Sequence, residues 1–344
     1  MKDNVERKPP TLRELPPPPE GRTGWPWTAG VKPGPPVRPD GTPWPRITVV
    51  TPSLNQGMYI EETIRSVLLQ QYPGMQYVIF DGGSSDESVS IIRKYEPWIS
   101  HWVSEPDRGQ SHAINKGLAM ATGDIVNWIN SDDILTPGAL RIVGEAFVDC
   151  DMVAGGNYFL FRNLEKDRYA KGLTARGLLR RESTSRLQQM AMWFRRDGAL
   201  LCGGMDEEMH FAFDQDFFVR YLHTFPRVTY VSEMLGWFRQ HEAAKTAALR
   251  PKFLPERLRT VDKIRQDPRW ADLKKDAEYA ARRYQWWIRL ADIVNSPVKS
   301  TRLRALRVLI TSGVDPSIRW DYVTRKAVKK LLMGSELRPF TPVI

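Results

Sequence analysis

The sequence predicts an α/β fold: a mostly parallel sheet flanked by helices, with a proline-rich N-terminal arm and a C-terminal helical extension. Short β-branched runs alternate with segments of helical periodicity from residue 47 to about residue 130, as in consecutive βαβ units. Half of the 26 prolines lie in residues 1–45, and after residue 250 the chain has helical periodicity almost to its end. We therefore expect three segments, 1–45, 46–248 and 249–344.

The N-terminal arm should be extended. Proline fixes φ and lacks an amide donor, so the run Pro16–Pro19 fits neither a helix nor a central strand. Polyproline II conformation is expected in places. The tryptophans Trp25, Trp27 and Trp44 predict that the arm packs on a surface, and we favour the body of the domain over a partner protein.

The segment 46–248 carries the predicted sheet. Strands are expected at 47–51, 77–80, 98–103, 125–129, 152–161 and 229–231, and helices at 59–71, 88–95, 112–121 and 216–223. Ligands bind at the carboxyl ends of parallel strands, where the following loops gather. Polar loops follow three of the predicted strands, at 52–57, 81–86 and 130–133.

The net charge of +10 is concentrated in the C-terminal extension. From Arg250 to Ile344 there are 22 Lys and Arg against 10 Asp and Glu, which gives +12 and leaves −2 for residues 1–249. Residues 302–310 and 320–332 predict basic amphipathic helices, so we expect peripheral attachment to an anionic membrane surface. The plainer alternative is that these helices pack on the domain or form a dimer contact. No nucleic-acid-binding module is recognised, and the oligomeric state stays open.

No apolar run approaches the roughly 20 residues that span a bilayer. The two cysteines, Cys150 and Cys202, lack metal-ligand spacing and are expected to be buried thiols in a reducing compartment. The sequence therefore predicts a cytoplasmic protein, with attachment to the inner face of the cell membrane as a further hypothesis.

Carboxylates gather in two of the polar loops. Asp81 and Asp86 lie in a Gly/Ser turn, and Asp132 and Asp133 directly follow a hydrophobic run. Carboxylate oxygens suit a hard divalent cation such as Mg²⁺ or Mn²⁺, which would stabilise a diphosphate leaving group. Asp-rich turns commonly cap helices or shape the backbone, so this plainer interpretation stays open for each pair.

Four motifs in order resemble those of family 2 glycosyltransferases of the GT-A (Rossmann-like) fold. They are Thr51-Pro52-Ser53-Leu54-Asn55, Asp81-Gly82-Gly83-Ser84-Ser85-Asp86, Asn115-Lys116-Gly117 with Ala121-Thr122-Gly123-Asp124, and Asn130-Ser131-Asp132-Asp133. Weaker agreement at 213–217 and 239–241 extends the resemblance over residues 46–246. It implies inverting transfer from a nucleoside-diphosphate sugar, with UDP favoured, to a hydroxyl of a glycan or lipid-linked acceptor in surface polysaccharide or glycan assembly.

The resemblance also implies roles for individual residues. The donor would be bound by Thr51, Pro52, Asn55, Asp81, Gly109, Gln110, Lys116, Ser131 and Arg239. The metal, Mn²⁺ or Mg²⁺, would be bound by Asp132, with Asp133 and His241 nearby. Asn130 departs from the family pattern, because an aspartate is common there, and this puts metal affinity or metal choice in question.

Asp214 is the expected general base. An inverting displacement needs one carboxylate opposite the leaving group to take the proton of the acceptor hydroxyl. Asp216 also fits the acidic motif, but it is better placed to cap the helix or to contact the acceptor. Both residues also suit a helix N-terminus on electrostatic grounds alone.

Two other functions remain open. A nucleotidyltransferase would usually carry a glycine- and basic-rich phosphate loop after the first strand, where this chain has residues 52–55. A glycan-binding or scaffold protein without catalytic activity is favoured only by Asn130. The aspartates Asp81, Asp132 and Asp214 favour an enzyme.

Overall fold

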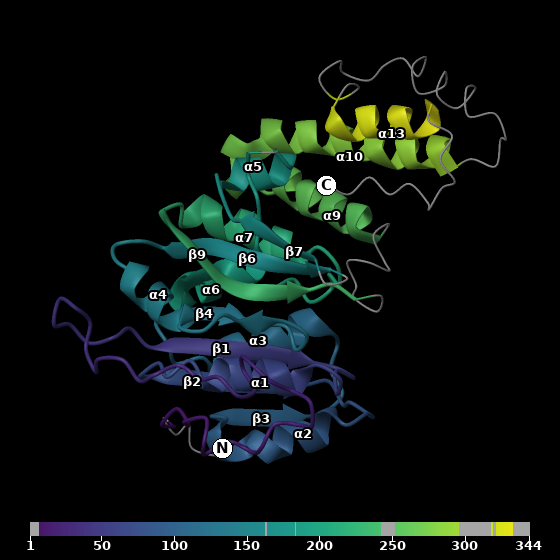
Figure 1. The fold of residues 1–344 in the computed structure, drawn as a ribbon. Coiled ribbons are helices and arrows are strands. Elements are labelled where there is room, and N and C mark those ends of the chain that lie inside the picture. Colours follow the sequence, from purple (N-terminus) through teal and green to yellow (C-terminus); the bar gives the residue numbers. More distant parts are fainter. Residues whose placement is uncertain are drawn as a thin grey trace. The chain divides into compact units, whose positions relative to one another are not determined.

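The computed structural model of the protein describes residues 7–161, 164–182, 184–241, 252–295, 318 and 321–332. The chain forms two compact units, and Figure 1 shows their elements. Unit 1 comprises Met1–Leu178 and Glu182–His241, and unit 2 comprises Leu179–Arg181 and Glu242–Ile344. The arm thus belongs to the unit that holds the sheet. The boundary expected after residue 248 lies outside the described residues.

A nine-stranded sheet forms the centre of unit 1, as far as the described residues show it. Its strands are β1 (Ile47–Ser53), β2 (Met75–Asp81), β3 (His101–Ser104), β4 (Ile125–Trp128), β5 (Ile134–Leu135), β6 (Met152–Phe161), β7 (Leu164–Tyr169), β8 (Met192–Arg195) and β9 (Val228–Arg239). They lie in the order β3-β2-β1-β4-β8-β6-β9-β5, with β7 beside β6. The α/β fold predicted from the sequence is therefore confirmed.

The sheet changes character at β8. Strands β3, β2, β1 and β4 are all parallel, as the alternating pattern predicts. Beyond them only β6 and β9 pair in parallel, whereas the β4–β8, β8–β6, β6–β7 and β5–β9 pairs are antiparallel. The β6–β7 pair is antiparallel because β7 begins three residues after β6 ends, and so short a link allows only an antiparallel hairpin. The parallel arrangement thus belongs to the first half of the sheet.

Helices cover this sheet. In unit 1 they are α1 (Ile60–Leu68), α2 (Ser88–Tyr95), α3 (Gln110–Met120), α4 (Ala139–Ala146), α5 (Ala175–Arg180, shared with unit 2), α6 (Arg196–Leu201) and α7 (Phe213–Thr224), with 3-10 turns η1 (Glu96–Trp98) and η2 (Gln189–Ala191). In α1, Ile60, Ile64 and Val67 are fully buried at helical spacing, so this stripe forms the inward face. The strand expected at 98–103 begins later because Pro97 lies in η1, and β3 starts at His101.

The proline-rich arm packs on unit 1, as predicted. Arg65 of α1 is completely buried, and its guanidinium donates hydrogen bonds to the backbone oxygens of Pro16 (2.8 Å), Pro26 (3.0 Å) and Trp27 (3.0 Å). The Trp27 ring lies 5.3 Å from the Arg65 guanidinium carbon, and Trp25 Nε1 donates to Leu135 O at 2.8 Å. The arm therefore supplies backbone carbonyls that accept hydrogen bonds from the buried Arg65 guanidinium.

The start of the arm is also in contact with the domain. Arg7 donates to Pro97 O at 2.5 Å. Gln71 donates to Pro10 O. Trp44, at the end of the arm, is 7% exposed and lies edge-on to Tyr72, with ring centroids 5.6 Å apart.

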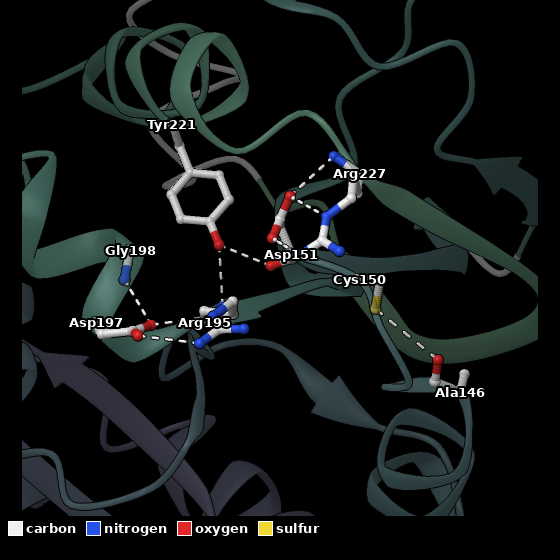
Figure 2. Close-up of polar contacts among 8 residues, drawn as sticks. All are labelled: Ala146, Cys150, Asp151, Arg195, Asp197, Gly198, Tyr221 and Arg227. Atoms are coloured by element: carbon white, nitrogen blue, oxygen red, sulfur yellow. Dashed lines mark hydrogen bonds and ion pairs between the residues drawn. The ribbon is translucent and has the colours of Figure 1, made fainter.

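Asp151 and Arg227, which directly precede β6 and β9, form an ion pair at the ends of these strands that lie away from the polar loops (Figure 2). The Asp151 carboxylate accepts from Arg227 Nη2 at 2.9 Å and Nε at 3.2 Å, and also from the Arg227 backbone N–H. The Tyr221 hydroxyl donates to Asp151 O at 2.7 Å and accepts from Arg195 N at 3.1 Å. Arg195 in turn pairs with the exposed carboxylate of Asp197. These contacts fix the strand starts that lie far from the polar loops.

Neither cysteine is in a disulfide. Cys150 is buried, with its Sγ 3.9 Å from Ala146 O, and Cys202 is half-buried. Burial raises the pKa of both thiols, which keeps them protonated and unreactive.

Unit 2 is helical in its described part: α9 (Phe253–Gln266), the 3-10 segment η4 (Pro268–Leu273), α10 (Lys274–Asn295) and α13 (Tyr322–Leu332). Val323, Ala327 and Leu331 of α13 are buried. On α10, Trp286 Nε1 donates to Thr324 Oγ1 at 2.8 Å. The apolar face of α13 therefore packs inside unit 2, which is the plainer of the two sequence alternatives for these residues.

The other residues of the expected amphipathic helices, 302–310 and Trp320, lie outside the described residues. Within the described parts of the chain, no helix has both the length and the apolar character of a membrane span.

Candidate functional site

The polar loops after β1 and β2 are joined by hydrogen bonds. Asn55 N donates to Ser84 Oγ at 2.7 Å, and Asn55 Oδ1 accepts from Ser85 N at 2.9 Å. Asn55 has φ +52, a left-handed conformation that asparagine tolerates better than most residues. Gly57 N donates to Asp86 Oδ2 at 2.8 Å. Asn55 and Asp86 thus hold the two loops together at the carboxyl ends of their strands.

Asp81 lies at the bottom of this pair of loops and is 2% exposed. Its Oδ2 accepts from Ser84 N (2.8 Å), Gly83 N (3.2 Å) and Ser104 Oγ (2.7 Å), and its Oδ1 accepts from Ser84 Oγ (2.6 Å). A carboxylate offers about four lone-pair positions, so three acceptances saturate Oδ2 while Oδ1 keeps one. Asp81 therefore caps its turn and still has an acceptor position for a ligand.

The side chain of Thr51 does not reach the loops. Thr51 is fully buried, and its hydroxyl lies 3.1 Å from Tyr77 OH in the interior. Burial raises the pKa of Tyr77, which keeps this pair neutral. Pro52 is also buried. The Thr51 side chain is thus engaged in the interior, and its expected contact with a nucleoside stays a prediction that this burial does not favour.

Ser53 differs from Thr51. It ends β1 directly beside Asp81 and is 5% exposed. Its Oγ has no hydrogen-bond partner among the described residues. A buried hydroxyl without a partner is costly, so this atom is suited to a hydrogen bond from or to a bound molecule.

Two expected metal ligands meet across the loops that follow β4 and β9. His241 Nε2 lies 3.0 Å from Asp132 Oδ2, and the side chains are 15% and 21% exposed. Ligands at about 2.1 Å that are neighbours in an octahedron lie about 3 Å from each other, so this spacing suits one shared cation. No group of three or more His, Cys, Asp or Glu with metal-site geometry occurs among the residues that the structure describes. The remaining positions of a cation here would go to a ligand or to water.

Asp133 has a different place from its neighbour Asp132. It is 1% exposed, and its two oxygens accept from Arg239 N at 3.0 Å and Asn130 Nδ2 at 3.1 Å. Burial, and then the charge of Asp132, raise the pKa of Asp133 well above its ordinary value. In this position Asp133 supports the loop through Arg239 N and Asn130, and its expected part in metal binding stays a prediction.

Helix α1 supports the metal loop. The Thr63 hydroxyl lies 2.7 Å from Asp133 O and 3.0 Å from the carbonyl of the buried Ser131. At the start of α1 the Tyr59 ring lies 4.7 Å from the His241 ring. These contacts connect the helix that follows the β1 loop to both sides of the Asp132–His241 pair.

Arg239 is paired rather than free to move. Its Nη2 donates to Glu62 Oε2 at 2.8 Å, and both side chains are less than one-fifth exposed. Its guanidinium carbon also lies 4.9 Å from the Tyr59 ring centroid. Its positive charge nevertheless stays at the edge of the site, where a diphosphate would approach.

The residues around the start of α3 contact the loop that follows β4. Gln110 Nε2 donates to Asn130 Oδ1 at 2.8 Å. Gly109 has φ +114, and a Cβ there would lie 3.2 Å from His210 Nδ1, so only glycine fits easily. Lys116 forms an ion pair with Glu105 at 2.6 Å, and Glu105 N donates to Asp81 O at 3.0 Å. Lys116 is thus linked to the Asp81 turn indirectly, through Glu105.

Asp214 and Asp216 differ in their burial and in their contacts. Asp216 is 1% exposed and pairs with Arg220 at 2.8 Å, while Arg220 also donates to the carbonyls of Cys202 and Gly204. Asp214 is partly exposed in the first turn of α7. Asp216 therefore holds the turn at 202–204, and Asp214 is the carboxylate that faces solvent.

Three residues of this site were missed from the sequence: Tyr59, Glu62 and Thr63. They belong to the first turn of α1, directly after the Asn55 loop, and no motif marks them. Their spacing of three and four positions puts them on one helix face, which is the signal that was available.

Comparison with known proteins agrees with this geometry. Among solved structures, Staphylococcus aureus TarS in complex with UDP-GlcNAc superposes with a TM-score of 0.60, at 16% identity, over 85% of this chain and 93% of that one. The mannosyltransferase PcManGT from Pyrobaculum calidifontis, in complex with GDP-Man and Mn²⁺, gives 0.55 at 19% identity over 86% and 92%. This likeness shows that the chain has the GT-A fold.

Sequence comparison identifies the family. The family model "Glycosyl transferase family 2" matches residues 48–205. An uncharacterized protein of Mycobacterium tuberculosis is 30% identical over 295 residues, which cover 76% of this chain and 89% of the relative. The chain belongs to glycosyl transferase family 2.

Other relatives match over shorter stretches. An uncharacterized glycosyltransferase of Mycobacterium tuberculosis is 38% identical over 90 residues, 26% of this chain and 34% of the relative. The GalNAc(5)-diNAcBac-PP-undecaprenol beta-1,3-glucosyltransferase of Campylobacter jejuni is 27% identical over 135 residues, 38% and 44%. The chain thus spans about a third of the length of the first of these relatives and under half of the second.

Proposed function

We propose that the protein transfers a sugar from a nucleoside-diphosphate sugar to a hydroxyl of a glycan or lipid-linked acceptor, with inversion at the anomeric carbon. The observation that carries this proposal is the Asp132–His241 pair, connected through Tyr59 to the Asn55 and Asp81 loops. One relative whose name includes an undecaprenol-linked glycan supports assembly of a surface polysaccharide or similar glycan as the setting.

The nucleoside would bind at the loops after β1 and β2. Ser53 Oγ and the remaining lone pair of Asp81 Oδ1 are adjacent polar groups that lack saturating partners. Asn55 would line the opposite side. UDP is the favoured nucleotide, and the GDP-Man complex of PcManGT makes GDP the second choice.

The diphosphate would lie between these loops and Asp132. Asp132 and His241 suit Mn²⁺ or Mg²⁺, and Arg239 would add positive charge. A cation at this place would supply charge neutralisation for the departing diphosphate. Asn130, bonded to both Gln110 and Asp133, keeps the loop shape and lowers the negative charge of the site relative to an aspartate.

Asp214 would act as the base. Its carboxylate takes the proton of the acceptor hydroxyl while the oxygen forms its bond to the anomeric carbon, and the bond to the phosphate oxygen breaks with its electron pair. Asp216 is unsuited to this step because Arg220 occupies it. The ion pair instead fixes the turn next to the helix that carries Asp214.

The basic surface of unit 2 would bring the enzyme to an anionic membrane at the cytoplasmic face. Arg325, Lys326 and Lys329 on α13 are exposed, whereas Val323, Ala327 and Leu331 of this helix are buried. Attachment would thus depend on charge and weaken with salt. Co-sedimentation with anionic and neutral vesicles tests it, since equal pelleting with both would end the idea.

The test of the main proposal is a thermal-shift panel of nucleoside diphosphates and nucleotide sugars, with and without Mn²⁺ or Mg²⁺. A ligand that binds only the folded state raises the melting temperature. We expect a metal-dependent shift with one nucleotide that is lost in Asp132→Ala and kept in Asp292→Ala, an exposed aspartate of α10. No shift with any nucleotide would reject the transferase in favour of a glycan-binding scaffold.

A further inference from the structure

One pair of aromatic side chains lies beside the proposed site without a role in it. Tyr158 of β6 and Trp237 of β9 are direct neighbours in the sheet, and their rings are stacked, with centroids 5.5 Å apart and planes 23° from parallel. Both are half-buried, so part of each ring faces solvent. On the opposite face of the same strands, Phe159 and Phe238 stack at 5.2 Å, and Phe238 packs against the core. The face of these strands that packs on the core therefore has an aromatic pair of its own, Phe159 and Phe238.

The sheet register extends this pair into a row. Tyr158 lies opposite Asp167 of β7, and Trp237 lies opposite Ile134 of β5. Directly paired residues present their side chains on the same face, so Asp167, Tyr158 and Trp237 share one face. Asp167 is exposed. The two rings stack on each other, so each covers one face of the other, and the row offers the outer ring faces with one carboxylate beside Tyr158.

This chemistry fits a sugar ring. The flat side of a pyranose carries C–H groups that pack on an aromatic face, and its hydroxyls donate to a carboxylate. Binding sites for small polar molecules usually combine an apolar surface with a few such polar groups. An extended apolar partner would leave Asp167 unpaired and is a poorer fit.

The position of the row indicates whether it would bind the donor or the acceptor. Ile134 directly follows Asp133, and Trp237 lies two residues before Arg239, about 7 Å along the strand. The row is therefore next to the metal loop. The nucleoside loops follow β1 and β2, which the sheet order separates from β6 and β9. A molecule that reaches the metal loop from the side of β6, β7 and β9 would be the acceptor.

We infer that Tyr158 and Trp237 form a stacking platform for a sugar unit of the acceptor glycan, with Asp167 accepting hydrogen bonds from its hydroxyls. The inference rests on the proposed function for the identity of the ligand as an acceptor. It makes the platform a determinant of acceptor affinity and leaves donor binding to the loops after β1 and β2.

The test uses saturation-transfer NMR on the full chain, with methyl α- and β-glycosides of glucose, galactose, mannose and N-acetylglucosamine as probes. The wild type should transfer saturation to ring C–H groups of at least one glycoside. Trp237→Ala and Tyr158→Ala should weaken this binding about tenfold, because the apolar contact area is lost. Trp237→Phe should retain most of it, and Asp167→Asn should weaken it less than the alanine variants. Tyr322→Ala, which removes an exposed aromatic ring of unit 2, is the matched control and should change nothing.

A nucleotide thermal shift on the same samples separates the two hypotheses. Unchanged nucleotide shifts in all platform variants would show that the fold and the donor site are intact. Undiminished glycoside binding in Trp237→Ala, or no saturation transfer to any glycoside with the wild type, would overturn the platform and leave the transferase proposal standing. Glycoside binding that depends on Trp237 in a protein without any nucleotide shift would reject the transferase and keep the platform as a glycan site.

Discussion

His241 Nε2 lies 3.0 Å from Asp132 Oδ2, although 109 positions separate the two residues in the chain. Their contact depends on the pairing of β5 with β9, because Ile134 lies opposite Trp237 and this brings the ends of both loops together. The match to the family model ends at residue 205, before His241. One of the two candidate metal ligands therefore lies beyond the stretch that the family model matches.

His241→Ala should weaken metal binding while the nucleotide site stays formed. We expect the Mn²⁺ concentration for half-maximal nucleotide-dependent stabilisation to rise about tenfold or more, since even outer-shell partners of metal ligands are typically worth that much. His223→Ala, in the last turn of α7, is the control. An unchanged Mn²⁺ titration would remove His241 from the site.

Asp214→Asn and Asp216→Asn should fail in different ways. Loss of a general base typically costs 10² to 10⁴ in rate, roughly, so Asp214→Asn should lose turnover at an unchanged melting temperature. Asp216→Asn leaves Arg220, whose side chain is 19% exposed, without its carboxylate partner, and breaking such a largely buried pair typically costs about 3–5 kcal/mol of stability. Turnover and thermal unfolding measured on both variants check this, and the reverse pattern would exchange the two roles.

The stability of unit 1 should depend on Asp151 at neutral pH. Burial acts to raise the pKa of Asp151, but the hydrogen bonds and charge of Arg227 outweigh it, and the pKa is lowered. A lowered folded-state pKa stabilises the protein above the unfolded value, about 3.9, and this contribution disappears as the pH falls through the folded-state value.

Asp151→Asn should therefore lower the free energy of unfolding by about 1–3 kcal/mol at pH 7, and the difference from the wild type should shrink below about pH 4. Urea unfolding across this range measures it. Asp197→Asn is the matched control, because that carboxylate also pairs with an arginine but is 60% exposed and should matter less. A difference that is constant with pH would contradict the assignment.

The arm should be needed for stability. Trp27→Ala removes a buried ring that stacks on Arg65, and such substitutions typically cost about 3–5 kcal/mol. Arg22→Ala, which removes an exposed guanidinium 5.5 Å from the same ring, should stay within about 0.5 kcal/mol of the wild type. Urea unfolding of both variants tests this; equal stability of Trp27→Ala and wild type would mean that the arm is dispensable.

Much of this architecture could be predicted because its signals are local. The β-branched run at Ile47 and the stripe of Ile60 and Ile64 give the strand and the helix directly. The loops that follow the strands, including Asn55 and Asp81, had to gather at one edge once the strands were parallel.

The rest depends on contacts between distant segments. Asp132 and Asp133 are adjacent in sequence, yet one is at the surface and the other is buried, because only the Arg239 amide and Asn130 decide which carboxylate turns inward. The burial of Thr51 depends on its contact with Tyr77 of the neighbouring strand, which a short motif does not include. In the mixed half of the sheet, the β4–β8 and β5–β9 pairs join strands that lie far apart in the sequence.

Arg65 has a consequence for where the folded unit begins. A guanidinium in the interior of a protein needs acceptors, and besides the Tyr95 hydroxyl those of Arg65 come from Pro16, Pro26 and Trp27, about 40 to 50 positions upstream. A version of the chain that started at the first strand would keep every shared motif and still remove the three carbonyl acceptors of this buried cation. The fold of the sheet unit thus depends on a proline-rich segment that contributes none of the candidate site residues.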